Sequence, residues 1–389
     1  MSGLITGNFV FSVEQEYRVL MERNYLKLAQ KLWYPRLTKV HDTDSKSEIF
    51  EWLLQTATID QLSPQDGGEE SGNLNFEEIS SCLKTIAPAH HGKGYRIDKM
   101  RWENSLNRGM DPVGEWIAAQ SHYAGYYPQK QIAIRMMLGQ TINSYDNVPF
   151  FSKVHPCNPN IPKLGTYANL FTGAAVVGTP GVVGSGYPGA LPIDDSVTMD
   201  VAVTNLSKAI AYVTGSITQP NGQDSRNLEV AYLIHPPRMA ARVHQLLDTQ
   251  NVAKYAKVIA QAAAGGGAGS ADIGGVIESF GLAEPVRAVE LDGNRSFQAY
   301  LNGPEGAPQV ATGSDTTYYL VCKEAEQTEL GAMIMNLRQP FKMTFYSGEA
   351  GAEGIDAVLG RSQKMEWQHH AYMGFDVGHP FAMHAFLGA

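Results

Sequence analysis

The clearest helical pattern in the chain, between residues 111 and 137, constrains its fold most. Asp111 is a residue type that caps helices, and Pro112 suits the first helical position because it has no amide hydrogen to lose. Apolar residues then recur at helical spacing on both sides of Pro128: Val113, Trp116, Ile117, Ala124, Tyr127, Ile132, Met136 and Met137. The pattern predicts a helix of about seven turns at ~3.6 residues per turn, with a kink or a restart at Pro128.

Two strand-like runs precede this helix and enclose a polar insert. Residues 48–54 are rich in apolar and aromatic side chains, and residues 95–106 alternate apolar and polar side chains in their first part. Between them, residues 63–73 read SPQDGGEESGN, an acidic and glycine-rich composition that is typical of a mobile loop. We therefore expect a long hairpin. Because an isolated hairpin is only marginally stable in water, it should lie on its own domain or on a neighbour.

The first 47 residues predict an extended, partly helical arm. Aromatic side chains are frequent in it: Phe9, Phe11, Tyr17, Tyr25, Trp33 and Tyr34. So many aromatic rings need a surface to pack on. Two interpretations remain open, a helix packed on its own domain or an arm that reaches onto a neighbouring subunit.

Residues 164–193 contain no charged side chain and are long enough by count to span a bilayer. They also contain seven glycines and three prolines. A helix broken in this way could not satisfy its own backbone hydrogen bonds in lipid. The segment therefore predicts a loop, and no membrane span is expected.

The second half of the chain alternates between helical and strand patterns. Residues 199–213 and a segment that starts at Pro236 and Pro237 predict helices, with the buried strand LEVAYLI (228–234) between them. A further helix at 252–262 is expected to end in a flexible Gly/Ala stretch at 263–275. Later runs predict strands: VRAVEL (286–291), TYYLVC (317–322), FKMTFY (341–346) and the run 364–386.

Charge and cysteine usage exclude several classes of protein. The formal net charge of -9 argues against a dedicated DNA-binding surface. Cys82, Cys157 and Cys322 lie far apart and form no CxxC pair, which is typical of a reducing compartment. Residues 1–13 lack the basic segment and the long apolar core of a signal peptide. These features favour an intracellular product.

The motifs that could carry chemistry are weak. Gly184, Gly186 and Gly189 match GxGxxG, but Pro188 blocks the helix that a dinucleotide site requires. His369 and His370 would point to opposite faces of a strand, so they cannot grip one ion together. No phosphate-binding loop and no GxSxG nucleophile motif occurs. We therefore expect no catalytic, cofactor or metal site.

Four passages resemble the major head subunit family of Mu-like phages. AHHGKGYRIDKMRWENSLNR (89–108) is similar to the hairpin strand that leads into that family's spine helix, and NSYDNVPFFSKVHP (143–156) to the segment after it. The third passage, TNLSKAIAYV…LEVAYLIHPPRMAARVHQLL (204–247), is similar to the family's apical domain. The last, TYYLVCKEAE…FKMTFYSGE…KMEWQHHAYMGFDVGHPFAMHAFLG (317–388), is similar to its closing strands.

The resemblance implies an α+β fold, the Hong Kong 97-like major capsid fold. It divides the chain into an N-terminal arm (1–47), an extended hairpin (48–105), a peripheral domain with the spine helix (106–165 and 340–389), and an apical α/β domain (166–339). The insert at 61–75 and the loops at 172–190 and 263–275 make the chain longer than the family pattern. The subunit-interface candidates are Trp33, Trp52, Tyr95 and Trp102.

The function that the resemblance implies is that of a major capsid protein of a tailed bacteriophage. Such a protein assembles with itself into hexamers and pentamers of an icosahedral head, in the host cytoplasm, and becomes part of the virion. It encloses double-stranded DNA without sequence-specific binding, and scaffold, portal and decoration proteins are further expected partners. Two alternatives remain open, an encapsulin-like nanocompartment shell protein and a soluble α/β enzyme with an unrecognised site.

Overall fold

The computed structural model describes residues 31–54, 80–176, 186–220, 224–247, 284–300, 308–327, 331–346 and 364–388, with a few single residues and pairs between 15 and 28. Several expected features lie outside the described residues. They are most of the arm, the acidic insert at 63–73, the centre of the uncharged loop, the helix at 252–262 and the Gly/Ala stretch at 263–275.

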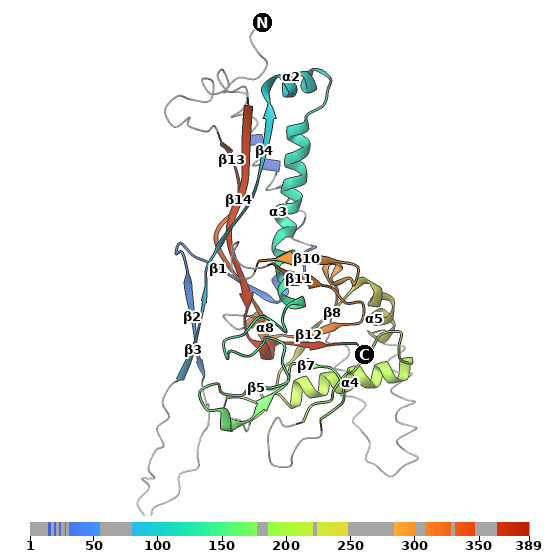
Figure 1. Cartoon of the computed structure of the whole chain (residues 1–389). Coiled ribbons are helices and arrows are strands. Elements are labelled where there is room, and N and C mark those ends of the chain that lie inside the picture. The colour runs from blue at the N-terminus through green and yellow to red at the C-terminus, as the bar shows by residue number, and fades with distance from the viewer. Residues whose placement is uncertain are drawn as a thin grey trace, which may run out of the picture.

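A four-stranded sheet in the order β1-β13-β14-β4 forms one half of the fold. Its strands are β1 (Thr38–Asp42), β13 (Met333–Tyr346), β14 (Lys364–Val377) and β4 (Ala89–Asp98). β1 runs parallel to β13, whereas the other pairs are antiparallel. The long strands β13, β14 and β4 extend beside helix α3 (Pro112–Met137), which gives this half an elongated shape (Figure 1).

A five-stranded sheet in the order β7-β15-β12-β8-β9 forms the other half. Its strands are β7 (Leu170–Phe171), β15 (Met383–Phe386), β12 (Tyr318–Cys322), β8 (Val230–His235) and β9 (Glu284–Arg287). The main helices beside it are α4 (Met199–Gly215) and α5 (Ala240–Leu247). The remaining elements are η1 (Tyr34–Arg36), β2 (Glu48–Leu54), β3 (Ser80–Ile86), α2 (Lys99–Asn107), β5 (His155–Pro156), η2 (Pro162–Leu164), β6 (Thr166–Tyr167), η3 (Pro237–Met239), η4 (Val289–Leu291), β10 (Ser296–Ala299), β11 (Gln309–Thr312), α8 (Glu324–Gln327) and η5 (Pro380–Ala382).

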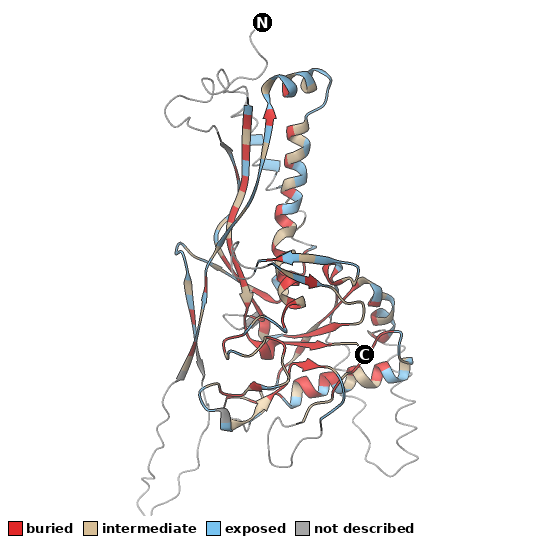
Figure 2. Cartoon of the chain, viewed as in Figure 1, coloured by how far each residue is buried: buried red, intermediate tan, exposed pale blue. Residues whose placement is uncertain are grey.

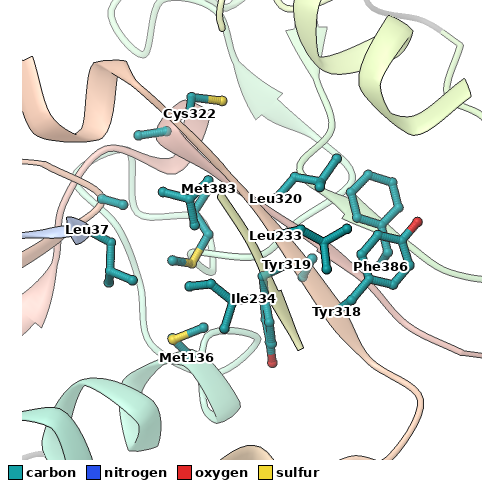
Figure 3. Close-up of a cluster of buried hydrophobic side chains, with 14 of the residues drawn as sticks. Leu37, Met136, Leu233, Ile234, Tyr318, Tyr319, Leu320, Cys322, Met383 and Phe386 are labelled. Carbon is teal, nitrogen blue, oxygen red and sulfur yellow. The ribbon is translucent and has the colours of Figure 1, made fainter. Parts of the chain in front are cut away.

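Aromatic stacking fills the core around the five-stranded sheet. The ring of Phe386 lies between those of Tyr318 and Phe171, with centroid distances of 4.8 and 4.3 Å. Met136 from α3 lies in the same buried cluster, which also contains Leu37 (Figure 3). Figure 2 shows buried residues concentrated in this half and alternating along β14. The C-terminal end of α3 therefore joins the two sheets in one core.

A second, separate core lies at the far end of α3. Trp102 from α2 and Trp367 from β14 are fully buried and meet edge to face, with a centroid distance of 5.4 Å. Ile97, Val113, Ile117, Met343 and Met365 complete this cluster. Because the cluster holds α2, α3, β4, β13 and β14 together, we call it the spine-tip core.

The predicted long helix is confirmed as α3. The Asp111 carboxylate accepts a hydrogen bond from the Val113 amide at 3.2 Å, and Pro112 is the first helical residue. The helix is continuous through Pro128, so the expected restart does not occur. Pro128 and its neighbours Ala124 and Ile132 are buried, and tertiary packing compensates for the one backbone hydrogen bond that proline cannot make.

We expect replacement of Asp111 by alanine to lower the free energy of unfolding by about 1–2 kcal/mol. The Asp111 carboxylate accepts from Trp102 Nε1 at 3.0 Å as well as from the Val113 amide, so the substitution removes both a cap and the partner of a buried indole. Urea unfolding of the chain measures the change. Asp111→Asn keeps a side-chain acceptor and should recover most of the loss; equal destabilisation by both variants would contradict this assignment.

The sequence-based interpretation of residues 95–106 as one strand is wrong in its second half. β4 ends at Asp98, whose carboxylate accepts from the amides of Met100 and Arg101 and so begins α2. The expected pairing of the hairpin is also corrected, because β2 pairs with β3, while β4 pairs with β14. Residues 286–291 form the end of β9 and the 3-10 turn η4 instead of a single strand. The predictions of α4, β8, α5 and β12 are confirmed.

Candidate assembly surfaces

The β2–β3 hairpin has two chemically different faces. Its register places Phe50 opposite Lys84 on one face, and Glu51 opposite Leu83 on the other. On the first face, Phe50 and Ile86 are buried against Ile334 of β13. The ring of His41 from β1 lies against Phe50, with a centroid distance of 4.9 Å. The inner face therefore attaches the hairpin to the four-stranded sheet. Figure 1 shows β2 and β3 at the left edge of the molecule.

A partly buried ion pair fixes this attachment. Lys84 Nζ lies 2.9 Å from the Asp376 carboxylate of β14 and donates to the backbone carbonyls of Asn143 and Val377, at 3.0 and 3.3 Å. One ammonium group thus joins β3, the end of β14 and the loop after α3. Burial lowers the pKa of the neighbouring Arg135 guanidinium to about 10, while Asp376 opposes that shift. The Lys84 ammonium and the Asp376 carboxylate hold the base of the hairpin in a defined place.

The outer face of the hairpin exposes apolar side chains. Ile49 is 64% exposed and Leu83 is 60% exposed, and they lie diagonally across the two strands. Two adjacent aliphatic side chains on a two-stranded sheet have no stabilising function toward solvent. They form the strongest candidate on the hairpin for contact with another protein surface. Sequence reasoning missed Leu83 because the polar run SSCLKTI (80–86) was not identified as a strand. Ile49 lies in the expected strand 48–54, but without the register its outward orientation was not predicted.

The end of the N-terminal segment is fastened to α3 and η4. The Trp33 indole donates to the Glu290 carboxylate at 3.2 Å, and the Trp33 amide donates to the Gln129 side chain at 2.9 Å. Gln129 in turn donates to Glu290 at 2.8 Å. Burial raises the pKa of the nearby Tyr126 hydroxyl, and its hydrogen bond to Glu290 raises it further. Trp33 is therefore held firmly against α3 and η4.

The other interface candidates occupy different environments. Trp102 is fully buried in the spine-tip core. Tyr95 is half-buried and stacks on Trp116, with a centroid distance of 4.9 Å. Trp52 belongs to β2 and is paired in register with Cys82, while its side chain lies outside the described residues. Trp33 and Trp102 are satisfied within one chain, and the role of all four at a subunit interface stays a prediction.

The described residues assemble no group of three metal-ligating side chains. His369 and His370 do lie on opposite faces of β14, the former stacked on Phe341 and the latter facing His90. Gly186 and Gly189 lie in a non-helical segment, and the next helix begins only at Met199. Among the helices that the structure describes, none is both long and apolar enough to cross a membrane.

No family model matches the sequence, and neither does any curated protein. Solved structures do match. The chain is similar to a chain in the capsid structure of the cyanophage P-SCSP1u, with a TM-score of 0.51 and 14% identity, over 92% of this chain and 88% of that one. The chain has a phage capsid fold. The expected α+β capsid fold of the Hong Kong 97 type is therefore confirmed.

Two further capsid structures resemble the chain less closely. The mature capsid of bacteriophage PhiM1 gives a TM-score of 0.48 and 10% identity, over 91% of this chain and 86% of that one. The capsid of the Myoviridae phage XM1 gives a TM-score of 0.43 and 9% identity, over 90% of each chain.

Proposed function

We propose that the chain is the major capsid protein of a tailed bacteriophage. In this proposal it assembles with itself into hexamers and pentamers of an icosahedral head that encloses double-stranded DNA. The observation that carries the proposal is the capsid fold, which matches the cyanophage P-SCSP1u capsid structure over 92% of the chain. The protein would act by building a wall, without catalysing a reaction, and would reside in the virion.

The proposal assigns a contact to each part of the fold. The arm (1–47) and the hairpin (48–105) would lie across adjacent subunits. The apical domain (166–339) would surround the five-fold and six-fold axes, and the peripheral domain (106–165 and 340–389) would meet its copies at the three-fold axes. Each contact would be modest, but closed symmetry repeats it many times, so the shell as a whole is stable.

The partners and the subfamily belong to the same proposal. Scaffold, portal and decoration proteins would join the shell, and the net charge of -9 would keep packaged DNA from adhering to its wall. We further propose that the chain belongs to the Mu-like major head subunits, because the passages at 89–108, 143–156, 204–247 and 317–388 resemble that family. Conserved order of these passages in new Mu-like head sequences would support this assignment.

Negative-stain electron microscopy of the purified chain, together with its sedimentation profile, tests the proposal. Closed shells or capsomer rings are expected. Enclosed nucleic acid would indicate a phage head, whereas enclosed protein would indicate a nanocompartment of the encapsulin kind. A compact monomer or dimer at several salt concentrations, with and without a scaffold protein, would contradict both.

We expect the double substitution Ile49→Asp and Leu83→Asp to abolish shell formation and leave the subunit folded. Both side chains are mostly exposed in one chain, so their loss removes little from the subunit core. Burying each side chain at an interface would contribute about 1.5–3 kcal/mol to the free energy of association of each subunit. The same contribution would be repeated for every subunit of the shell. Sedimentation and thermal unfolding measure the two effects.

The matched control is the double substitution Ile49→Leu and Leu83→Ile, which keeps the apolar area of the outer face. It should still form shells. Shells that persist in the aspartate variant would exclude this face of the hairpin from assembly.

A further inference from the structure

A histidine and an aspartate are buried together after the end of α3. The side chain of His155 is 0% exposed and that of Asp146 is 1% exposed, and His155 Nδ1 lies 2.6 Å from Asp146 Oδ2. Neither residue belongs to the candidate assembly surfaces. Burial of two ionisable groups away from water is costly, so the charge state of this pair requires a physical explanation.

Both ring nitrogens of His155 face oxygen atoms. Nδ1 is directed at the Asp146 carboxylate, and Nε2 lies 3.1 Å from the backbone carbonyl of Phe150. A carbonyl oxygen can only accept a hydrogen bond, so Nε2 must carry a hydrogen. If the ring were neutral, Nδ1 would then be an acceptor that faces an ionised carboxylate. The geometry therefore requires one further proton between Nδ1 and Oδ2.

The groups around the pair agree with a bound proton. The other oxygen of Asp146 accepts from the Val148 amide at 3.1 Å, which leaves Oδ2 for His155. The Arg226 guanidinium is engaged by the Thr218 carbonyl at 3.0 Å and by an aromatic ring, so His155 is left to neutralise Asp146. Desolvation raises the pKa of the phenols and thiols around the pair and lowers that of the neighbouring imidazole. Each of these groups is therefore neutral near pH 7: Tyr145, Tyr167, Cys82, Cys157 and His384.

The pair lies where the loop after α3 meets the five-stranded sheet. The Phe150 carbonyl that accepts from His155 also accepts from Asn169 Nδ2 at 2.7 Å. Asn169 is fully buried and donates as well to the Pro380 carbonyl at 2.9 Å, shortly before β15. One carbonyl group thus connects the histidine to both sides of this junction.

We propose that His155 and Asp146 form a proton-dependent lock between the loop after α3 and the five-stranded sheet. With the proton bound, both nitrogens of the ring are satisfied and the carboxylate is neutralised. When alkaline pH removes the proton, a lone pair of the ring faces an oxygen atom, and Asp146 becomes an unpaired buried charge. The lock is therefore closed at neutral and lower pH and opens as the pH rises. The inference does not depend on the proposed function, because all the groups belong to one chain.

Nitrogen-15 NMR of the full chain, labelled at histidine, tests the proton directly. The signals of His155 are assigned as those that disappear in His155→Gln. At pH 7 we expect Nε2 to be protonated, with the further proton either on Nδ1 or on the Asp146 carboxyl group. A ring that is protonated at Nδ1 alone would overturn the proposal, because the pair would then hold no extra proton.

Hydrogen exchange measures the opening. Between pH 7 and pH 9, the protection factors of the Phe150 and Asn169 amides should fall at least tenfold, whereas that of the Trp367 amide should change less than twofold. Asp146→Asn keeps the size of the side chain and removes the charge, so it should abolish this pH dependence. Asp195→Asn changes an exposed aspartate and should leave it as it is. Equal protection at the two pH values in the unmodified chain would exclude the lock. So would a pH dependence that persists in Asp146→Asn, shown to be folded by circular dichroism.

Discussion

Lowering the pH from 7 to 5 should reduce the free energy of unfolding by about 2 kcal/mol for each of two buried histidines, His379 and His384. Desolvation lowers the pKa of each to about 3, and the nearby Arg226 and His155, respectively, lower it further. In the unfolded chain each imidazole takes up a proton near pH 6.5. In the folded chain each stays neutral until the pH falls to about 3. Stability is therefore complete above pH 6.5 and declines as the pH falls toward 3.

The packing explains why neither ring accommodates a charge. His384 is fully buried, and its nearest polar contact is the weak one between Nδ1 and Cys322 Sγ at 4.0 Å. His379 stacks on Phe381, with a centroid distance of 4.7 Å. The Arg226 guanidinium lies over the ring of Phe381, 4.0 Å from its centroid. A proton on either histidine would place an unsolvated positive charge in an apolar core.

Urea unfolding, followed by tryptophan fluorescence at pH 7 and pH 5, measures the effect. His384→Gln should remove about half of the pH dependence that the two histidines cause together. His122→Gln changes an exposed histidine of α3 and should leave the pH dependence as it is. A free energy of unfolding that is equal at the two pH values would contradict the prediction.

Replacement of Trp367 by alanine should lower the free energy of unfolding by about 3–5 kcal/mol. The side chain is fully buried in the spine-tip core, against Trp102. Because this core is separate from the main one, the damage should be greatest at the far end of α3. Hydrogen exchange should become faster in α2 and in the first turns of α3, and stay unchanged in β12.

The control for this prediction is Tyr300→Ala, which truncates an aromatic side chain that is 52% exposed. This substitution should change the free energy of unfolding by no more than about 0.5 kcal/mol. A loss below 1 kcal/mol in the Trp367 variant would show that the spine-tip core does not hold these elements together.

Local signals in the sequence predicted several elements well. α3 was predictable because its cap, its first-position proline and its apolar spacing all lie within the helix itself. α4, β8 and α5 were predictable because the apolar pattern of each also lies within the element itself. By contrast, helix α2 (Lys99–Asn107) was missed. It directly follows the alternating pattern of a strand, and Asp98 was not recognised as the residue that caps the helix. Residues 80–86 were missed because four of the seven side chains in SSCLKTI are polar.

The candidate surfaces were less predictable than the fold. The partner of β4 is β14, and no pattern near residue 95 identifies a strand so distant in sequence. Ile49 and Leu83 became candidates only when the register placed them on one outward face. A sequence can indicate that Trp33 or Trp102 is buried, but it cannot indicate whether its own chain or another covers it. Here Glu290, Gln129 and Trp367 from the same chain surround them.

The strand order of the two sheets has a consequence for biosynthesis. β14 lies between β13 and β4, and β15 lies between β7 and β12, although these two strands are the last of the described strands to leave the ribosome. Until they emerge, neither sheet can close, and strands made much earlier remain without a neighbour. The chain therefore completes both sheets only after residue 386 has been synthesised.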